Sequence, residues 1–194
     1  MKLIYLVIIL FGSFGSIHAN ETKYRSEARD KIETIYLAGG CFWGMQQLLR
    51  SQPGVTATEV GYMGDNAHKV TYELVKTGKT KFAETVQVQF DKTKTNLRNI
   101  LAYFFKIHDP TTLNQQGNDI GQQYRSAIFY ESLEQKILAQ NLIQEITKKK
   151  IFKKPITTEV TAALKWNTAE EYHQNYLQKN PDGYTCHFER DLKL

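Results

Sequence analysis

Apolar and polar positions alternate along several short stretches of the chain and repeat every three to four residues along others. A period of two is typical of strands, and a period near 3.6 is typical of amphipathic helices. Clusters of glycine, proline and asparagine separate these stretches and mark turns. The pattern predicts strands over 34–38, 56–62, 83–90, 124–130 and 156–161, and helices over 42–51, 97–108, 133–147 and 169–178.

Strands and helices are interleaved along 194 residues, without repeats or an internal linker. This length suits one domain, and mixed runs of both elements indicate an α+β class. We expect a single-domain, two-layer α+β sandwich with a mixed β-sheet. Residues 70–75 fit a short helix or a strand equally well, and 111–123 form a long polar loop. After the Asn180-Pro181-Asp182-Gly183 turn, an irregular and mobile C-terminal tail is expected.

The first residues have the layout of a secretory signal peptide. Lys2 precedes an apolar run over 3–14, and Ala19 follows at a plausible cleavage point. We therefore expect a signal peptide over 1–19, a polar lead-in over 20–33 and one domain over 34–194. The mature protein would then be exported, and a periplasmic location is the expectation. The alternative is an uncleaved membrane anchor, for which the apolar run is short.

The net charge of +5 arises largely from lysines at 148–150, 153 and 154. No nucleic-acid-binding motif accompanies them. We interpret the excess as a solvated basic surface and expect no nucleic-acid partner.

The strongest chemical signal is Gly40-Cys41-Phe42-Trp43-Gly44, at the junction of a predicted strand and a predicted helix. Glycines permit a sharp bend there. A helix N-terminus favours anions, so the sequence predicts a lowered pKa and a nucleophilic thiolate for Cys41. The alternative is an ordinary buried core cysteine.

Cys186 is the second of only two cysteines in the chain. In an oxidising compartment two cysteines commonly form a structural disulfide. Here one cysteine lies at an activated position and the other in a polar tail, which favours a labile redox bond instead. Both interpretations remain open from the residues alone.

Glu84 shares one face of its predicted strand with Val86, Val88 and Phe90. A carboxyl group on an apolar face has a raised pKa unless it is paired, and such a group can act as a general acid. The alternative is that Glu84 lies at the exposed end of the strand. His173 could join the cysteines in a metal site, but the spacing matches no zinc signature, so no metal is expected.

Several motifs resemble those of the type A peptide methionine sulfoxide reductases. The Cys41 motif is similar to the family's signature, and Thr71-Tyr72 and Ala83-Glu84 follow in the same order. The resemblance covers about 34–188 and includes Gln116-Gly117-Asn118-Asp119, Gln123-Tyr124-Arg125-Ser126, and Ala169-Glu170-Glu171-Tyr172-His173-Gln174. The chain departs from the pattern in having one C-terminal cysteine, displaced by Thr185.

The resemblance implies a ferredoxin-like core and a repair enzyme that reduces methionine S-sulfoxide, free or in oxidised proteins. Cys41, Glu84 and Cys186 would be catalytic: nucleophile, general acid and resolving cysteine. Phe42 and Trp43 would enclose the methyl group, Tyr72 and Tyr124 would hold the oxygen, and Asp119 would support the site. The resemblance implies a monomer without a cofactor, reduced by an external dithiol protein such as thioredoxin.

Two other classes also use or contain such a cysteine pair. A thiol peroxidase or disulfide oxidoreductase would need an activated cysteine, although no C-x-x-C motif is present. An exported binding domain would contain a Cys41–Cys186 bridge as a structural element only.

Overall fold

The computed structural model describes residues 31–66 and 70–194. The chain divides into two compact units, Met1–Ile32 and Glu33–Leu194, and the fold described below is that of the second. The expected signal peptide and most of the lead-in lie outside the described residues. Among the residues that the structure describes, no helix has the length and apolar character needed to cross a membrane.

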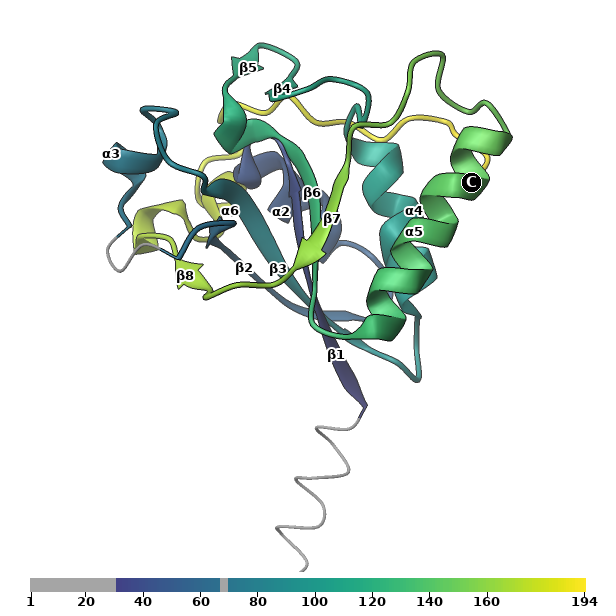
Figure 1. Cartoon of the computed structure of the whole chain (residues 1–194). Coiled ribbons are helices and arrows are strands. Elements are labelled where there is room, and N and C mark those ends of the chain that lie inside the picture. The colour runs from purple at the N-terminus through teal and green to yellow at the C-terminus, as the bar shows by residue number, and fades with distance from the viewer. Residues whose placement is uncertain (1–30, 67–69) are drawn as a thin grey trace, which may run out of the picture. The chain divides into compact units, whose positions relative to one another are not determined.

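A six-stranded mixed sheet forms the centre of the fold (Figure 1). Its order is β7-β6-β1-β3-β2-β8; β6 and β7 run parallel, whereas β1–β6, β2–β3 and β2–β8 are antiparallel. A separate hairpin pairs β4 with β5. The strands are β1 Ile32–Gly39, β2 Val55–Met63, β3 Ala83–Asp91, β4 Gln115–Gln116, β5 Asp119–Ile120, β6 Ser126–Tyr130, β7 Glu159–Ala162 and β8 Asn167–Thr168.

Helix starts follow the capping chemistry of the sequence. The Ser132 side chain accepts a hydrogen bond from the Gln135 backbone, and the Asn96 side chain accepts one from the Asn99 backbone. The helices are α2 Phe42–Arg50, α3 Tyr72–Val75, α4 Leu97–Ile107, α5 Leu133–Lys148 and α6 Tyr176–Lys179, with 3-10 turns η1 Gln122–Tyr124 and η2 Glu171–His173.

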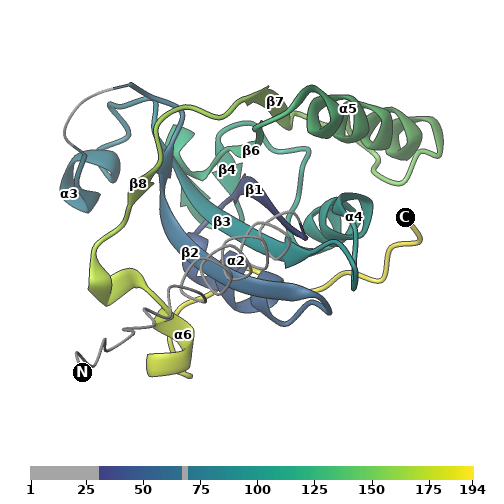
Figure 2. The same cartoon turned by 90° about the horizontal axis from the view of Figure 1, so that it is seen from below.

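The two faces of the sheet have different partners. Along β1, Ile35 and Leu37 belong to a large core cluster with apolar residues of α2, α4 and α5. Tyr36 and Ala38 belong to a smaller cluster on the other face, against which Trp166 packs. Figure 2 shows α4 and α5 side by side on the helical layer. The alternation of side chains along β1 therefore accounts for the apolar clusters on both faces of the sheet. The expected two-layer α+β class is confirmed.

The predicted helix over 169–178 is wrong. Thr168 of β8 pairs with Gly61 of β2, so the segment just before the predicted helix is a strand, and Asn175 adopts a left-handed conformation with φ of 57°. The side chain of Gln174 bonds to both backbone polar groups of Val60. The segment therefore satisfies its polar groups through the sheet, which leaves only η2 and the single turn α6.

Smaller differences occur where local patterns were ambiguous. Residues 70–75 contain the short helix α3, and the loop over 111–123 contains the β4–β5 hairpin. The strand β7 begins three residues later than its predicted start at 156.

Candidate active site

The turn from β1 into α2 brings Cys41 to the end of the sheet. Gly40 has a φ of 108°, a conformation that favours glycine, and Cys41 is the residue that precedes the first turn of α2. A Cβ atom at Gly40 would lie 2.5 Å from the side chain of Gln116. The bend predicted from the glycines is therefore present at Gly40, and the close approach of Gln116 is a second reason for glycine at this position.

A cavity of about 130 Å³ opens above this turn. It is lined by all seven residues to which the family resemblance gives a role in the first step of the chemistry, and by one aromatic residue from the C-terminal tail. The lining residues are Cys41, Phe42, Trp43, Tyr72, Glu84, Asp119, Tyr124 and Tyr184.

Glu84 is buried at the helical face of β3, with 3% of its surface exposed. One of its carboxyl oxygens accepts a hydrogen bond of 3.1 Å from the backbone N–H of Phe42. Burial raises the pKa of Glu84 to about 8 and the charge of Asp119 adds to the rise, although the Phe42 bond opposes it. The alternative of an exposed strand end is wrong, and Glu84 holds a proton at neutral pH.

The thiol of Cys41 does not have the lowered pKa that its helix position predicts. Burial raises its pKa and the nearby Glu84 adds to the rise, while the backbone of Trp43 opposes it. The first backbone N–H of α2 already donates to Glu84, so one fewer N–H group at the helix start is free to stabilise a thiolate at Cys41. Desolvation therefore exceeds the helix effect, and Cys41 is a protonated thiol in the free protein.

Tyr72 and Tyr124, two of the three tyrosines that line the cavity, keep their phenolic protons. Burial raises the pKa of Tyr72 to about 12, and burial also raises the pKa of Tyr124 well above its usual value. The backbone of Tyr72 is fixed by the carboxylate of Glu170, which also accepts a hydrogen bond from Tyr62. Tyr72 and Tyr124 therefore bring two hydroxyl donors to the cavity, and the contact with Glu170 holds the backbone of Tyr72.

Phe42 and Trp43 form an apolar wall that is held by the segment after β8. The Trp43 ring stacks on Tyr176 with 3.8 Å between centroids, and its indole N–H donates to Nδ1 of His173 at 3.0 Å. His173 is buried and lies 5.1 Å from the Phe42 ring. His173 thus orients the aromatic wall. Within 31–66 and 70–194, no group of three or more His, Cys, Asp or Glu residues could hold a metal ion.

Cys186 lies beside the cavity, and its thiol is free and half-buried. Its sulfur is 3.2 Å from Oδ2 of Asp119, which also accepts a hydrogen bond from Tyr184. A hydrogen bond from the Cys41 backbone partly offsets the rise that burial and Asp119 cause in the pKa of Cys186. His187 is buried against Gly39, so the expectation of a freely mobile tail is wrong at this point.

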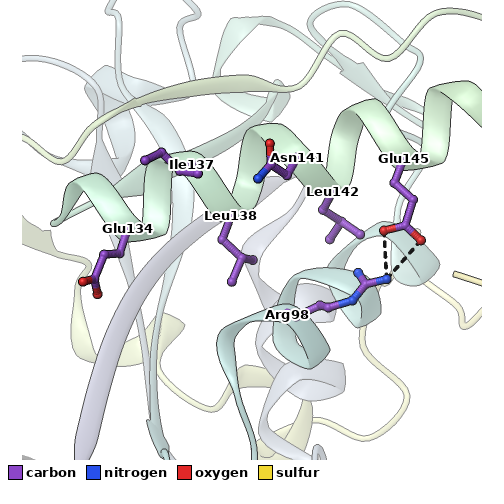
Figure 3. Close-up of a pocket in the computed structure, with 7 residues that line it drawn as sticks. All are labelled: Arg98, Glu134, Ile137, Leu138, Asn141, Leu142 and Glu145. Carbon is purple, nitrogen blue, oxygen red and sulfur yellow. Dashed lines mark hydrogen bonds and ion pairs between the residues drawn. The ribbon is translucent and has the colours of Figure 1, made fainter.

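A larger cavity of about 390 Å³ lies elsewhere, between α4 and α5. Figure 3 shows its Arg98–Glu145 ion pair and the aliphatic side chains of Ile137, Leu138 and Leu142 along α5. Neither cysteine lines it. The smaller cavity therefore remains the candidate site despite its size.

The family assignment follows from comparison with known proteins. Residues 33–194 match the family described as peptide methionine sulfoxide reductase. The chain belongs to this family. The activity expected from the motifs is thereby confirmed: the protein is a reductase that converts methionine sulfoxide to methionine with thiol chemistry.

Individual relatives agree with this assignment. The reductase is 49% identical over 160 residues to peptide methionine sulfoxide reductase MsrA of Streptomyces avermitilis, covering 82% of this chain and 92% of that one. Its fold is similar to reduced Mxr1 of Saccharomyces cerevisiae, with a TM-score of 0.78, 37% identity and coverage of 84% and 94%. The likeness extends to Mxr1 in complex with Trx2, with a TM-score of 0.56, 24% identity and coverage of 84% and 92%.

Two residues near the site carry contacts that the sequence reading did not assign. Tyr184 lines the cavity, and Glu170 supports Tyr72. Tyr184 had a visible signal, because it is an aromatic residue two positions before Cys186. Glu170 lies in a motif of the family resemblance, but no contact with Tyr72 was predicted for it.

Proposed function

We propose that this reductase acts on the S epimer of methionine sulfoxide, both free and in oxidised proteins, with Cys41 as nucleophile and Glu84 as general acid. The observation that carries the proposal is the proximity of a buried thiol and a buried, protonated carboxyl group in one small cavity. Sulfoxide sulfur becomes electrophilic when its oxygen is protonated. A proton held near neutral pH at this position suits that requirement.

The cavity offers an apolar side and a polar side to the substrate. Phe42 and Trp43 provide a wall for the S-methyl group, while the hydroxyl groups of Tyr72 and Tyr124 donate to the sulfoxide oxygen. Asp119 carries a second carboxyl group at the edge of the cavity, beside Cys186. Simultaneous recognition of a methyl group and an oxygen fixes the configuration at sulfur, which supports selection of a single epimer.

The first step transfers oxygen from the substrate sulfur to Cys41. The Cys41 sulfur attacks the substrate sulfur, Glu84 gives its proton to the oxygen, and the thiol proton of Cys41 returns to Glu84. The attack forms a bond between the two sulfurs. The hydroxyl group then moves to the Cys41 sulfur as the original S–O bond and the new S–S bond break, so methionine leaves and Cys41 becomes a sulfenic acid. The substrate sulfur is reduced and the Cys41 sulfur is oxidised, so electrons and protons balance.

The second step removes the sulfenic acid through Cys186. The two sulfurs form a disulfide and water is released; an external dithiol then reduces the disulfide. A thioredoxin-like protein fits this role, and the yeast relative Mxr1 has been solved in complex with Trx2. The proposed chemistry uses no cofactor other than this reductant.

An epimer-resolved assay tests the proposal. The protein is incubated with a methionine sulfoxide peptide of known configuration and a dithiol donor, and methionine formation is measured. We expect turnover of the S peptide and none of the R peptide. Equal rates for the two epimers would contradict the proposed seating of the methyl group and oxygen.

Replacement of Cys186 by serine tests the resolving step. We expect one methionine per enzyme and then a stall, because Cys41 remains a sulfenic acid that a dimedone reagent traps. Turnover with a protein dithiol should fall sharply, whereas a small thiol rescues part of it. Equal steady-state rates for the unaltered enzyme and the variant, without a Cys41–Cys186 disulfide by mass spectrometry, would contradict the role.

We also propose that the protein is exported to the periplasm after cleavage of a signal peptide. The apolar run over 3–14 and the small residue Ala19 support this location. N-terminal sequencing of the protein from the exported fraction is expected to begin near Asn20. Recovery of an intact Met1 in the membrane fraction would indicate an anchor instead.

A further inference from the structure

His187 follows Cys186 directly, and only 7% of its surface is exposed. Its Nε2 lies 2.8 Å from the carbonyl oxygen of Gly39. Its Nδ1 lies 3.5 Å from the sulfur of Cys186. The proposed function assigns nothing to this ring, although the ring contacts the sulfur that must react in the second step.

The contacts of His187 determine which ring nitrogen carries the hydrogen. A carbonyl oxygen only accepts, so Nε2 donates to Gly39. Burial lowers the pKa of His187 to about 4, which keeps the ring neutral near physiological pH. A neutral imidazole has one N–H, so Nδ1 presents a lone pair to the thiol of Cys186.

We infer that His187 is the general base of the resolving step and accepts the thiol proton of Cys186 at Nδ1. The inference rests on the proposed role of Cys186 as the resolving cysteine. As the Cys186 sulfur attacks the sulfenic sulfur of Cys41, the S–S bond forms and the S–O bond breaks. The thiol proton moves to Nδ1 and then to the departing hydroxyl group, which leaves as water.

Asp119 is the competing acceptor, since Oδ2 lies 3.2 Å from the same sulfur. Its negative charge raises the pKa of Cys186 and therefore opposes formation of a thiolate. His187 instead becomes positive as it takes the proton, and a positive ring stabilises the thiolate. Electrostatics thus favours His187 as the base and Asp119 as a group that orients the thiol.

Other groups near Cys186 and His187 affect the pKa values of these two residues in the free enzyme. Tyr184 and the backbone of Cys41 face Cys186, and both oppose the rise in its pKa. Arg190 contributes to the lowered pKa of His187, and His187 to that of the buried His108. A resting imidazolium is therefore disfavoured, and the proton transfer accompanies the attack.

Local geometry holds the ring over the start of α2. The His187 backbone N–H donates to Oγ1 of Thr185 at 3.1 Å. A Cβ atom at Gly44 would lie 2.6 Å from Nδ1 of His187. The absence of a side chain at Gly44 therefore leaves the space that the ring occupies. The hydrogen bond to Thr185, the residue that displaces Cys186 from the family pattern, holds the His187 backbone in place.

Two substitutions distinguish a general-base role of His187 from a purely structural role in anchoring the tail. In His187→Gln the side-chain amide can still donate to Gly39 but supplies no base, whereas His187→Asn loses the contact with Gly39 as well. Glu189→Gln is the matched control, because Glu189 lies in the same tail and pairs with Lys106 at the surface. After one equivalent of substrate, the decay of dimedone-reactive sulfenic acid is followed from pH 6 to 9, with melting temperatures measured in parallel.

We expect both histidine variants to slow this decay by about 10²-fold at neutral pH, the lower end for a lost general base. The decay rates of both variants should rise about tenfold per pH unit, since the Cys186 thiolate must then form without a base. The unaltered enzyme and Glu189→Gln should show a flatter dependence of the decay rate on pH. If His187→Gln fails to fold, the profile of His187→Asn decides.

An anchoring role gives a different pattern. The sulfenic acid of His187→Gln would then decay at the rate of the unaltered enzyme, and that of His187→Asn would decay more slowly by the same factor at every pH. Either result overturns the general-base role. If the unaltered enzyme forms no Cys41–Cys186 disulfide, the proposed resolving role of Cys186 itself fails. The two failures are therefore distinguishable.

Discussion

Replacement of Cys41 by serine is expected to abolish sulfoxide reduction, including the first turnover. A serine hydroxyl is far less acidic and less nucleophilic than a thiol, and the buried position offers no solvation for an alkoxide. The measurement is methionine released per enzyme in a single turnover, by chromatography. The expected value is indistinguishable from the blank without protein.

The fold should survive this change, because serine differs from cysteine by one atom and Phe42, not the sulfur, makes the hydrogen bond to Glu84. Cys186→Ser is the matched control, since it replaces the other cysteine and keeps the first methionine. Substantial methionine from a folded Cys41→Ser protein would remove Cys41 from the role of nucleophile.

Replacement of Glu84 by glutamine is expected to slow the first reductive step by about 10²–10⁴-fold, the usual range for a positioned general acid. The amide can accept the Phe42 hydrogen bond but cannot deliver a proton. Single-turnover rates in rapid-quench experiments measure the effect. A rate equal to that of the unaltered enzyme would exclude proton donation by Glu84.

The pH dependence gives a second test of the same residue. The pKa of Glu84 is raised to about 8, so its proton-donating form is complete well below pH 8 and is lost as the pH rises through that value. The thiol of Cys41 stays protonated over this range, because burial raises its pKa further. The rate of the unaltered enzyme should therefore fall above pH 8, and Glu84→Gln should not show this fall.

The sequence was sufficient wherever the local pattern and the tertiary environment agree. Alternation along 83–90 predicted both a strand and the burial of Glu84, because the same face carries Val86, Val88 and Phe90. The glycines around Cys41 predicted the strand-to-helix turn, because few other residues adopt the required bend. The motifs of the long loop predicted that Asp119 and Tyr124 would reach the cavity.

Failures arose where tertiary contacts override local chemistry. The position of Cys41 predicts a lowered pKa, but burial and Glu84 reverse the direction, and neither effect is visible from a helix start alone. Gln174 and Asn175 have ordinary helix-compatible neighbours, yet the Gln174 side chain binds β2 and the Asn175 side chain accepts a hydrogen bond from Gln46 of α2. The docking of His187 depends on an empty space above Gly44, which no periodicity encodes.

The hydrogen bond between His187 and Gly39 joins positions 148 residues apart in a chain of 194. During synthesis the proposed nucleophile Cys41 emerges long before the proposed resolving residue Cys186, so the proposed catalytic cycle can be completed only after both parts of the domain have left the ribosome. Contacts of such long sequence separation also slow folding, since a long loop must close first. A nascent chain that contains Cys41 but not yet Cys186 would therefore be unable to resolve a sulfenic acid within the same chain.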